Sequence, residues 1–278
     1  MSELLKAILL GIIQGLAEFL PVSSSGHLEL GKVLLGFEAA AEDSLMFTVI
    51  VHAGTVLSTM VVFRKVIWDI VRGFFKFEWN AETRFVVYVL VSIIPVGIVY
   101  VFFKDPLEAL FNGNILLVGC MLIITGGLLF LTRYAQALRV EEGEPVKLHT
   151  AFIIGIAQAA AVLPGISRSG STISTGLLLG VDKEKIAGFS FLMVLPPIIG
   201  ATLLDVKDVV EKVNAVGVDQ AITISPLALV VGFIAAFVTG VLACTWMIRI
   251  VKRGKLQWFA YYCFAVGLVC IVASLAME

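Results

Sequence analysis

Three side chains capable of acid–base or nucleophilic chemistry lie close together near the start of the chain: Glu18, Ser24 and His27. Glu18 could act as a general acid or base, or could hold a divalent cation that bridges phosphates. Ser24 is a candidate nucleophile. His27 could be a nucleophile, a general acid for a leaving group, or a residue that orients Ser24. Together the three groups are suited to chemistry on a phosphate group.

A second polar segment, PGISRSGST at 164–172, adds Arg168 to these groups. A guanidinium can bind phosphate through two parallel hydrogen bonds. An arginine at membrane depth is costly, so it is a functional candidate for which an anionic partner is expected. The alternative is a purely structural ion pair with Glu18, and the two roles are compatible.

The two polar segments are copies of one pattern. Four pairs of positions recur at one constant separation: Gln14 and Gln158, Ser23 and Ser167, Ser25 and Ser169, Gly26 and Gly170. Each copy is expected to break at a proline and then restart a helix, whose free N–H groups and positive dipole end suit phosphate. The residues expected to bind phosphate are Gln14, Ser23, Ser25, Gly26, Ser167, Arg168, Ser169, Gly170 and Thr172. The serines could instead be helix caps. Gln158, His52 and His149 are expected to be structural.

The composition is that of an integral membrane protein. Of the 278 residues, 59% are hydrophobic and 15% are charged, against about 45–50% and 25% in soluble domains. The net charge of −1 gives no indication of a nucleic-acid partner. The four cysteines all lie in apolar tracts without metal or disulfide spacing, and are expected to be core residues.

Six tracts are long and apolar enough to span a bilayer. They are residues 45–63, 85–103, 114–132, 186–204, 224–248 and 257–277. The two polar segments lie outside them, in 4–36 and 149–180, and each consists of two short apolar stretches around a Pro/Ser/Gly break. We expect each to form a re-entrant helical hairpin, because irregular backbone at membrane depth must be buried in protein or line a cavity.

Loop charges predict the orientation. The 64–84 and 249–256 loops are rich in Lys and Arg and are expected to be cytoplasmic, whereas 104–113 and 205–220 are expected outside. Both termini then lie outside, and the second half is inverted relative to the first. The predicted fold is an all-α polytopic membrane protein with about six transmembrane helices and two re-entrant hairpins in an inverted-topology repeat. It forms one membrane domain, 1–278, whose halves, approximately 1–132 and 149–278, are joined by a cytoplasmic loop at about 133–148. Inverted repeats commonly hold their site near the membrane midplane.

These segments resemble a known family. QGLAEFLPVSSSGH at 14–27 is similar to the (E/Q)xxxE…PxSSxGH motif of undecaprenyl-diphosphatase, the bacterial bacitracin-resistance membrane phosphatase, and PGISRSGSTIS at 164–174 is similar to its PGxSRSxxT motif. The motif residues carried over are Gln14, Glu18, Ser24, His27, Ser167, Arg168 and Thr172. Gln14 stands at the first, often acidic, motif position, so Glu18 would act without a second carboxylate there.

The resemblance implies hydrolysis of undecaprenyl diphosphate, a prenyl diphosphate lipid, to undecaprenyl phosphate and phosphate. This reaction recycles the lipid carrier of peptidoglycan synthesis, and so bears on cell-wall biogenesis, cell shape and antibiotic resistance. It further implies a divalent cation, Mg²⁺ or Ca²⁺, and a site that opens to the periplasmic or extracellular face of the bacterial cytoplasmic membrane. The alternative function is a transporter or flippase for a phosphorylated prenyl lipid, because inverted repeats are typical of transporters. The expected partners are this lipid and membrane lipids, and a homodimer is left open.

Overall fold

The fold is a bundle of helices. The structure, a computed structural model, describes residues 1–37, 41–110, 114–137, 143–216 and 224–277. Over these ranges the regular secondary structure is helical, apart from one isolated bridge between Glu144 and Val181. The helices are α1 (Glu3–Phe19), α2 (Ser24–Leu34), α3 (Ala41–Val62), α4 (Arg64–Phe74), α5 (Ala81–Ala109), α6 (Ile115–Ala137), α7 (Leu148–Ala160), α8 (Arg168–Leu178), α9 (Lys183–Met193), α10 (Leu195–Val216), α12 (Pro226–Lys252) and α13 (Gln257–Met277).

The predicted spans are confirmed. Among the described residues, five helical segments are long and apolar enough to cross a membrane: Ala81–Phe103, Ile115–Tyr134, Lys183–Leu204, Pro226–Lys252 and Gln257–Ala276. A sixth is formed if α3 is counted together with α4, from which it is bent by 74°. The protein is therefore an all-α polytopic membrane protein, as predicted.

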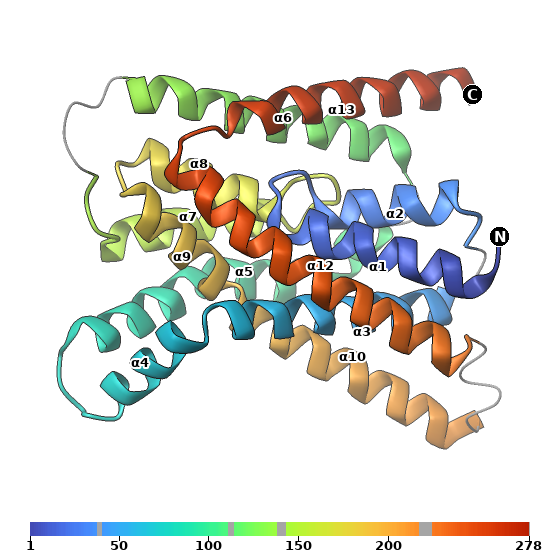
Figure 1. Ribbon diagram of the computed structural model, residues 1–278, viewed down its shortest axis with the longest axis horizontal. Coiled ribbons are helices and arrows are strands. Elements are labelled where there is room, and N and C mark those ends of the chain that lie inside the picture. Colours follow the sequence, from blue (N-terminus) through green and yellow to red (C-terminus); the bar gives the residue numbers. More distant parts are fainter. Residues whose placement is uncertain (38–40, 111–113, 138–142, 217–223, 278) are drawn as a thin grey trace.

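The two polar segments form the two hairpins. In the first, α1 ends at Phe19 and α2 begins at Ser24, and in the second, α7 ends at Ala160 and α8 begins at Arg168. Figure 1 shows α1 and α2 opening toward the end of the molecule that carries both termini, and α7 and α8 opening toward the opposite end. The two breaks therefore meet near the middle of the bundle, as an inverted repeat requires. Which membrane face each end lies on, and where the halves divide, stay predictions.

Small residues let each hairpin pack closely against a span of the other half. Helix α1 packs on α12, and α7 packs on α5. A Cβ atom at Gly11 would lie 2.4 Å from the carbonyl oxygen of Gly232, and one at Gly155 would lie 2.4 Å from that of Ser92. Close backbone approach of this kind is a principal means of helix association in lipid, where burial of apolar surface gives little driving force.

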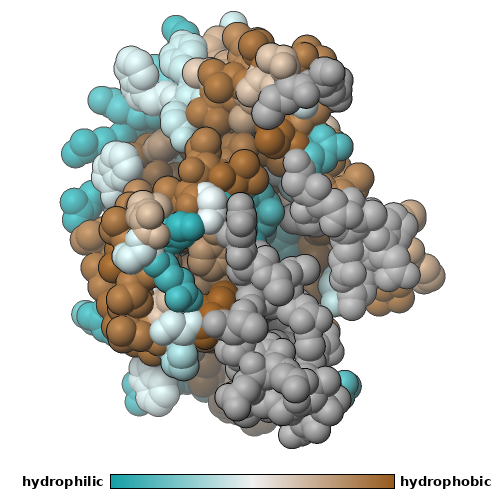
Figure 2. All heavy atoms as spheres, turned by 90° about the vertical axis from the view of Figure 1, so that its right-hand side faces the viewer, coloured by the Kyte–Doolittle hydropathy of each residue, from teal (hydrophilic) through white to brown (hydrophobic). Residues whose placement is uncertain are grey.

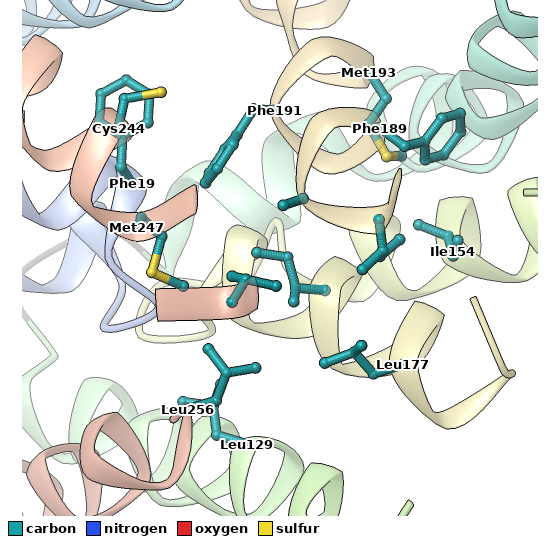
Figure 3. Close-up of a cluster of buried hydrophobic side chains, with 14 of the residues drawn as sticks. Phe19, Leu129, Ile154, Leu177, Phe189, Phe191, Met193, Cys244, Met247 and Leu256 are labelled. Atoms are coloured by element: carbon teal, nitrogen blue, oxygen red, sulfur yellow. The ribbon is translucent and has the colours of Figure 1, made fainter. Parts of the chain in front are cut away.

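A buried apolar cluster fixes the ends of the hairpins (Figure 3). Phe19, the last residue of α1, packs edge-on against Phe191 of α9, with 5.7 Å between ring centroids. Met247 of α12 and Leu256, which precedes α13, belong to the same cluster and are fully buried. The chain reversal after Phe19 is thus held by side chains from α9 and α12.

Three predicted details are wrong. The predicted 64–84 loop contains the amphipathic helix α4. The predicted 205–220 loop is partly helical, because α10 continues to Val216. Charged residues in a segment allow its helix to continue beyond the bilayer core into water. Cys120 is exposed rather than buried, because an outward-facing apolar residue of a membrane protein is covered by lipid.

Candidate active site

The meeting of the two hairpin breaks brings Glu18 and Arg168 into direct contact. Glu18 lies in the last turn of α1, and Arg168 is the first residue of α8. The Arg168 Nη2 group donates a hydrogen bond to the Glu18 Oε1 atom. The Glu18 side chain is only 5% exposed, whereas that of Arg168 is 28% exposed. The arginine is therefore the member of the pair that a ligand can reach more easily.

The other carboxylate oxygen of Glu18 also has polar neighbours. Gln14, one helical turn earlier, donates from Nε2 to Glu18 Oε2 at 2.9 Å. The Nε2 atom of His52 lies 3.9 Å from the same oxygen. Ser24 lines the same cavity as the Glu18 carboxylate. A buried carboxylate is stable only when it is paired in this way. The Ser24 hydroxyl in the same cavity is a group that a carboxylate could deprotonate.

A cavity of about 400 Å³ lies beside this pair. The first hairpin contributes Glu18, Ser24 and Ser25 to its wall, and the second contributes Ser167, Arg168 and Ser169. The wall also includes Glu29, Thr48 and Thr202, which extend it along α2, α3 and α10. Figure 2 looks onto the end of the molecule that carries the termini, where hydrophilic atoms are visible in a hollow between apolar helices.

Ser23 and Ser167 act as helix caps. The Ser23 hydroxyl accepts a hydrogen bond from the Gly26 N–H at 3.3 Å, and the Ser167 hydroxyl accepts one from the Gly170 N–H at 3.1 Å. Ser23 is 2% exposed and Ser167 is 1% exposed. Both serines are therefore helix caps, the alternative to phosphate binding, and the N–H groups of Gly26 and Gly170 already donate hydrogen bonds to them. Their predicted contact with phosphate would require these bonds to give way.

Thr172 lies one turn beyond Arg168 and away from the cavity. Its hydroxyl donates to the Arg168 carbonyl at 2.9 Å and lies 2.6 Å from the Ser190 hydroxyl. The residue is 1% exposed. This geometry favours a positioning role, in which Thr172 anchors the first turn of α8 to α9.

The structure does not bring His27 into the cavity. Its Nδ1 lies 2.9 Å from the Ser23 carbonyl oxygen, its Nε2 lies 2.8 Å from the Tyr262 hydroxyl, and the two rings are stacked. The imidazole lines a separate cavity of about 640 Å³, which α1, α12 and α13 also line. The chemical role predicted for His27 therefore stays a prediction, and this geometry supports a contact with Tyr262 that anchors α2.

The cavity wall includes His52 instead, a residue predicted to be structural. The His52 Nδ1 atom lies 2.8 Å from the carbonyl oxygen of Thr48, one turn earlier in α3. Nδ1 therefore donates its proton to that carbonyl oxygen, and the other ring nitrogen, Nε2, faces Glu18. The sequence feature that could have identified His52 is its place within an apolar span, because an ionisable residue at membrane depth indicates function. Glu29 is a second polar residue of the wall, but Lys32 engages it at 2.8 Å.

The donor set suits a divalent cation only if phosphate supplies most of the ligands. The described residues contain no group of three or more His, Cys, Asp or Glu side chains that could hold a metal. Glu18 is one carboxylate, and the Oε1 atom of Gln14 beside it is buried without a hydrogen-bond partner. Mg²⁺ typically takes one or two carboxylates together with substrate phosphates and water. The residues therefore fit a cation shared with a diphosphate better than an all-protein cage.

The arrangement combines a fixed cation at Arg168, a serine hydroxyl near a carboxylate, and two helix starts that meet at one point. Positive groups fixed before the reaction stabilise the charge that develops in phosphoryl transfer. The apolar helices around the site would admit the chain of a lipid substrate. The geometry thus suits the phosphorylated head group of a membrane lipid.

Comparison with known proteins agrees with this chemistry. The family model described as "Bacitracin resistance protein BacA" matches residues 7–269. Undecaprenyl-diphosphatase of Bacteroides fragilis is 56% identical over 272 residues, covering 98% of each chain. Undecaprenyl-diphosphatase of Parabacteroides distasonis is 55% identical over 270 residues, covering 97% of this chain and 98% of the relative. A protein of the same name from Methanobrevibacter smithii is 37% identical over 288 residues. The chain therefore belongs to the bacitracin resistance protein BacA family.

Proposed function

We propose that this protein is a membrane phosphatase that hydrolyses undecaprenyl diphosphate to undecaprenyl phosphate and inorganic phosphate. The observation that carries the proposal is the contact of Arg168 with Glu18 where the two hairpin breaks meet, beside a serine-lined cavity. The names of the relatives agree with it. No observation favours the transporter alternative.

Arg168 binds the diphosphate together with those first-turn N–H groups of α2 and α8 that the Ser23 and Ser167 caps leave free. The Ser24 hydroxyl, near the Glu18 carboxylate, attacks the terminal phosphorus and gives its proton to Glu18. The bond from that phosphorus to the bridging oxygen breaks, and undecaprenyl phosphate leaves with the electron pair. Water then cleaves the phosphoserine to release phosphate and restore Ser24. A Mg²⁺ or Ca²⁺ ion near Glu18 would neutralise phosphate charge when bound. Direct attack by water, with Glu18 as the base, uses the same pocket.

Purified protein in detergent with Mg²⁺ should release phosphate from undecaprenyl diphosphate. We expect Arg168→Ala to lower kcat by about 100- to 1000-fold, the usual cost of removing one electrostatic donor. Arg133→Ala is the matched control, because Arg133 is exposed at the end of α6. Wild-type-like turnover in Arg168→Ala would refute the proposal.

The nucleophile and the cation can be tested separately. Quenching the reaction at early times should trap a phosphate on Ser24, detected by mass spectrometry of the peptide, and Ser24→Ala should lose both this adduct and turnover. If Ser24→Ala still turns over, direct attack by water is favoured. Chelation should abolish activity, and added Mg²⁺ or Ca²⁺ should restore it.

The cavity favours substrate entry from the end of the molecule that carries the termini. Its wall extends to Thr48, in the first part of α3, and along α2, which runs back toward that end. With the termini predicted outside, we propose that the site opens to the outer face of the cytoplasmic membrane. A membrane-impermeant thiol reagent on Thr48→Cys in intact cells would test this, and labelling only after lysis would contradict it.

A further inference from the structure

A third cavity lies at the other end of the molecule, where Figure 1 shows α4. It has a volume of about 650 Å³ and is lined by residues of α4, α5 and α9, by the segment before α7, and by Ile248. Much of its wall is apolar, including Phe85, Phe189 and Leu192. None of the residues assigned to the candidate active site lines it. Its volume is within the range of small-molecule binding sites.

The polar side chains of this cavity carry an excess of positive charge. Arg84, Lys147 and Lys185 lie in its wall with a single carboxylate, that of Glu184. Lys252 already pairs with Glu184 at 2.6 Å. Lys147 is paired with Glu144 at 2.5 Å, outside the wall. Among the described residues, Arg84 and Lys185 are therefore left without a carboxylate partner. Arg84 donates from Nε to the Asn80 carbonyl oxygen at 3.3 Å, which leaves its charge without a counter-ion. An apolar cavity with two cations that lack a carboxylate partner is complementary to an anionic head group with an apolar chain.

Helix α4 places this cavity at the predicted membrane surface. Arg72 lies over the Trp68 ring, 5.5 Å from its centroid, and Trp68 is exposed. Phe75, Phe77 and Trp79, which follow α4, are exposed as well. The 64–84 segment carries five cations against three carboxylates. Exposed aromatic residues among cations are typical of segments that lie in the interface of an anionic leaflet.

We propose that this cavity binds an anionic phospholipid of the leaflet at that end of the molecule. Arg84 and Lys185 contact the lipid phosphate, and an acyl chain occupies the space between α5 and α9. Helix α4 lies on the same leaflet and brings the head groups to the rim. The site is separate from the proposed diphosphate site and does not depend on the reaction assigned there.

The test uses the full-length protein in nanodiscs of phosphatidylcholine, with phosphatidylglycerol as the probe and native mass spectrometry as the readout. Wild type is expected to retain phosphatidylglycerol over phosphatidylcholine. Arg84→Gln with Lys185→Gln should weaken that binding by roughly 30-fold, from the loss of two cations near a lipid phosphate. The control, Arg133→Gln with Arg249→Gln, removes the same charge from exposed positions outside the cavity wall and should leave binding unchanged.

A second variant tests the apolar part of the site. A Cβ at Gly188 would meet no atom within 4 Å, and the residue lies in the cavity wall. Gly188→Leu should therefore fold, because leucine also favours a helix, but its side chain should occupy the acyl space and lower phosphatidylglycerol binding. Phosphatase activity should stay near wild type. Equal binding of the two phospholipids by wild type would overturn the proposal. So would equal losses in the control, or displacement of phosphatidylglycerol by trace undecaprenyl phosphate.

Discussion

Replacing the members of the Glu18–Arg168 pair one at a time and together separates its structural role from its chemical role. The variants are Glu18→Gln, Arg168→Gln and the double variant. Glutamine matches glutamate in shape and is shorter than arginine, but it keeps an N–H donor at position 168 and removes the charge at both positions. The pair is suitable because it joins the two hairpins at their breaks.

The magnitude follows from burial. In Arg168→Gln the Glu18 carboxylate, 5% exposed, loses its cation. Breaking a buried pair from one side costs about 3–5 kcal/mol. We expect the lower end, about 3 kcal/mol, because Gln14 still donates to Glu18 and His52 lies 3.9 Å away. The double variant has no unpaired charge at this point and should regain most of that stability. Its activity should stay at least 100-fold below wild type, since the charge on the phosphate remains unpaired.

Two assays on the same preparations measure these outcomes. Thermal unfolding in detergent reports stability, and phosphate release from undecaprenyl diphosphate reports activity. A double variant with recovered stability and near-wild-type turnover would refute a chemical role for the pair. If Arg168→Gln unfolds no earlier than Arg133→Gln, the stranded-charge argument is wrong, whatever the activity.

Three further predictions concern single sites. His52→Gln should lower kcat/KM roughly tenfold, because it removes the imidazole nitrogen that lies 3.9 Å from the Glu18 carboxylate. His149→Gln, at the exposed start of α7, should leave kcat/KM unchanged. Equal activities in the two variants would place His52 outside the mechanism. Gly15→Ala should destabilise the protein by about 1–3 kcal/mol in thermal unfolding, because the new Cβ would lie 2.6 Å from the backbone carbonyl oxygen of Ala236. A Cβ at Gly97 would meet open space, so Gly97→Ala should be neutral or stabilising in the same assay. Ser23→Gly should unfold at a higher temperature than Ser23→Ala. Both variants lose the hydroxyl that caps α2, but only glycine adopts the observed φ of 71° without strain. The reverse order of unfolding temperatures would contradict this backbone geometry.

The hairpins and spans could be predicted because membrane physics leaves few alternatives. Apolar tracts near the bilayer length must form helices, since every backbone polar group in lipid needs an internal partner. The breaks after Phe19 and Ala160 could be located because the prolines and serines interrupt otherwise apolar stretches. The contact of Glu18 with Arg168 was foreseen as an ion pair, since two opposite charges at membrane depth are expected to meet.

The cavity is lined by His52 and not by His27, for a geometric reason. His27 is close in sequence to Glu18 and Ser24, but the turn of α2 on which it lies faces Tyr262 of α13. His52 is distant in sequence, and only the packing of α3 beside α1 brings it to Glu18. Residues that are close in the sequence of one hairpin need not point into the same cavity. The packing of each helix against its neighbours fixes its rotation about its own axis, and this rotation decides which side chains face the cavity.

The repeat explains why one half carries the reactive groups. Both copies use a serine in the same way, as a cap that starts the second helix of the hairpin, at Ser23 and Ser167. The capping frame is therefore shared, and both copies turn the residue after the cap into the same cavity. That residue is a hydroxyl nucleophile candidate in one copy, Ser24, and a cation in the other, Arg168. A symmetric pocket with two serines would lack the fixed positive charge that holds a diphosphate. A pocket with two arginines would lack a nucleophile, and the single carboxylate of Glu18 could neutralise only one of them. Under the proposed mechanism, the departure from symmetry at this one position gives a single cavity both a nucleophile and a phosphate-binding cation.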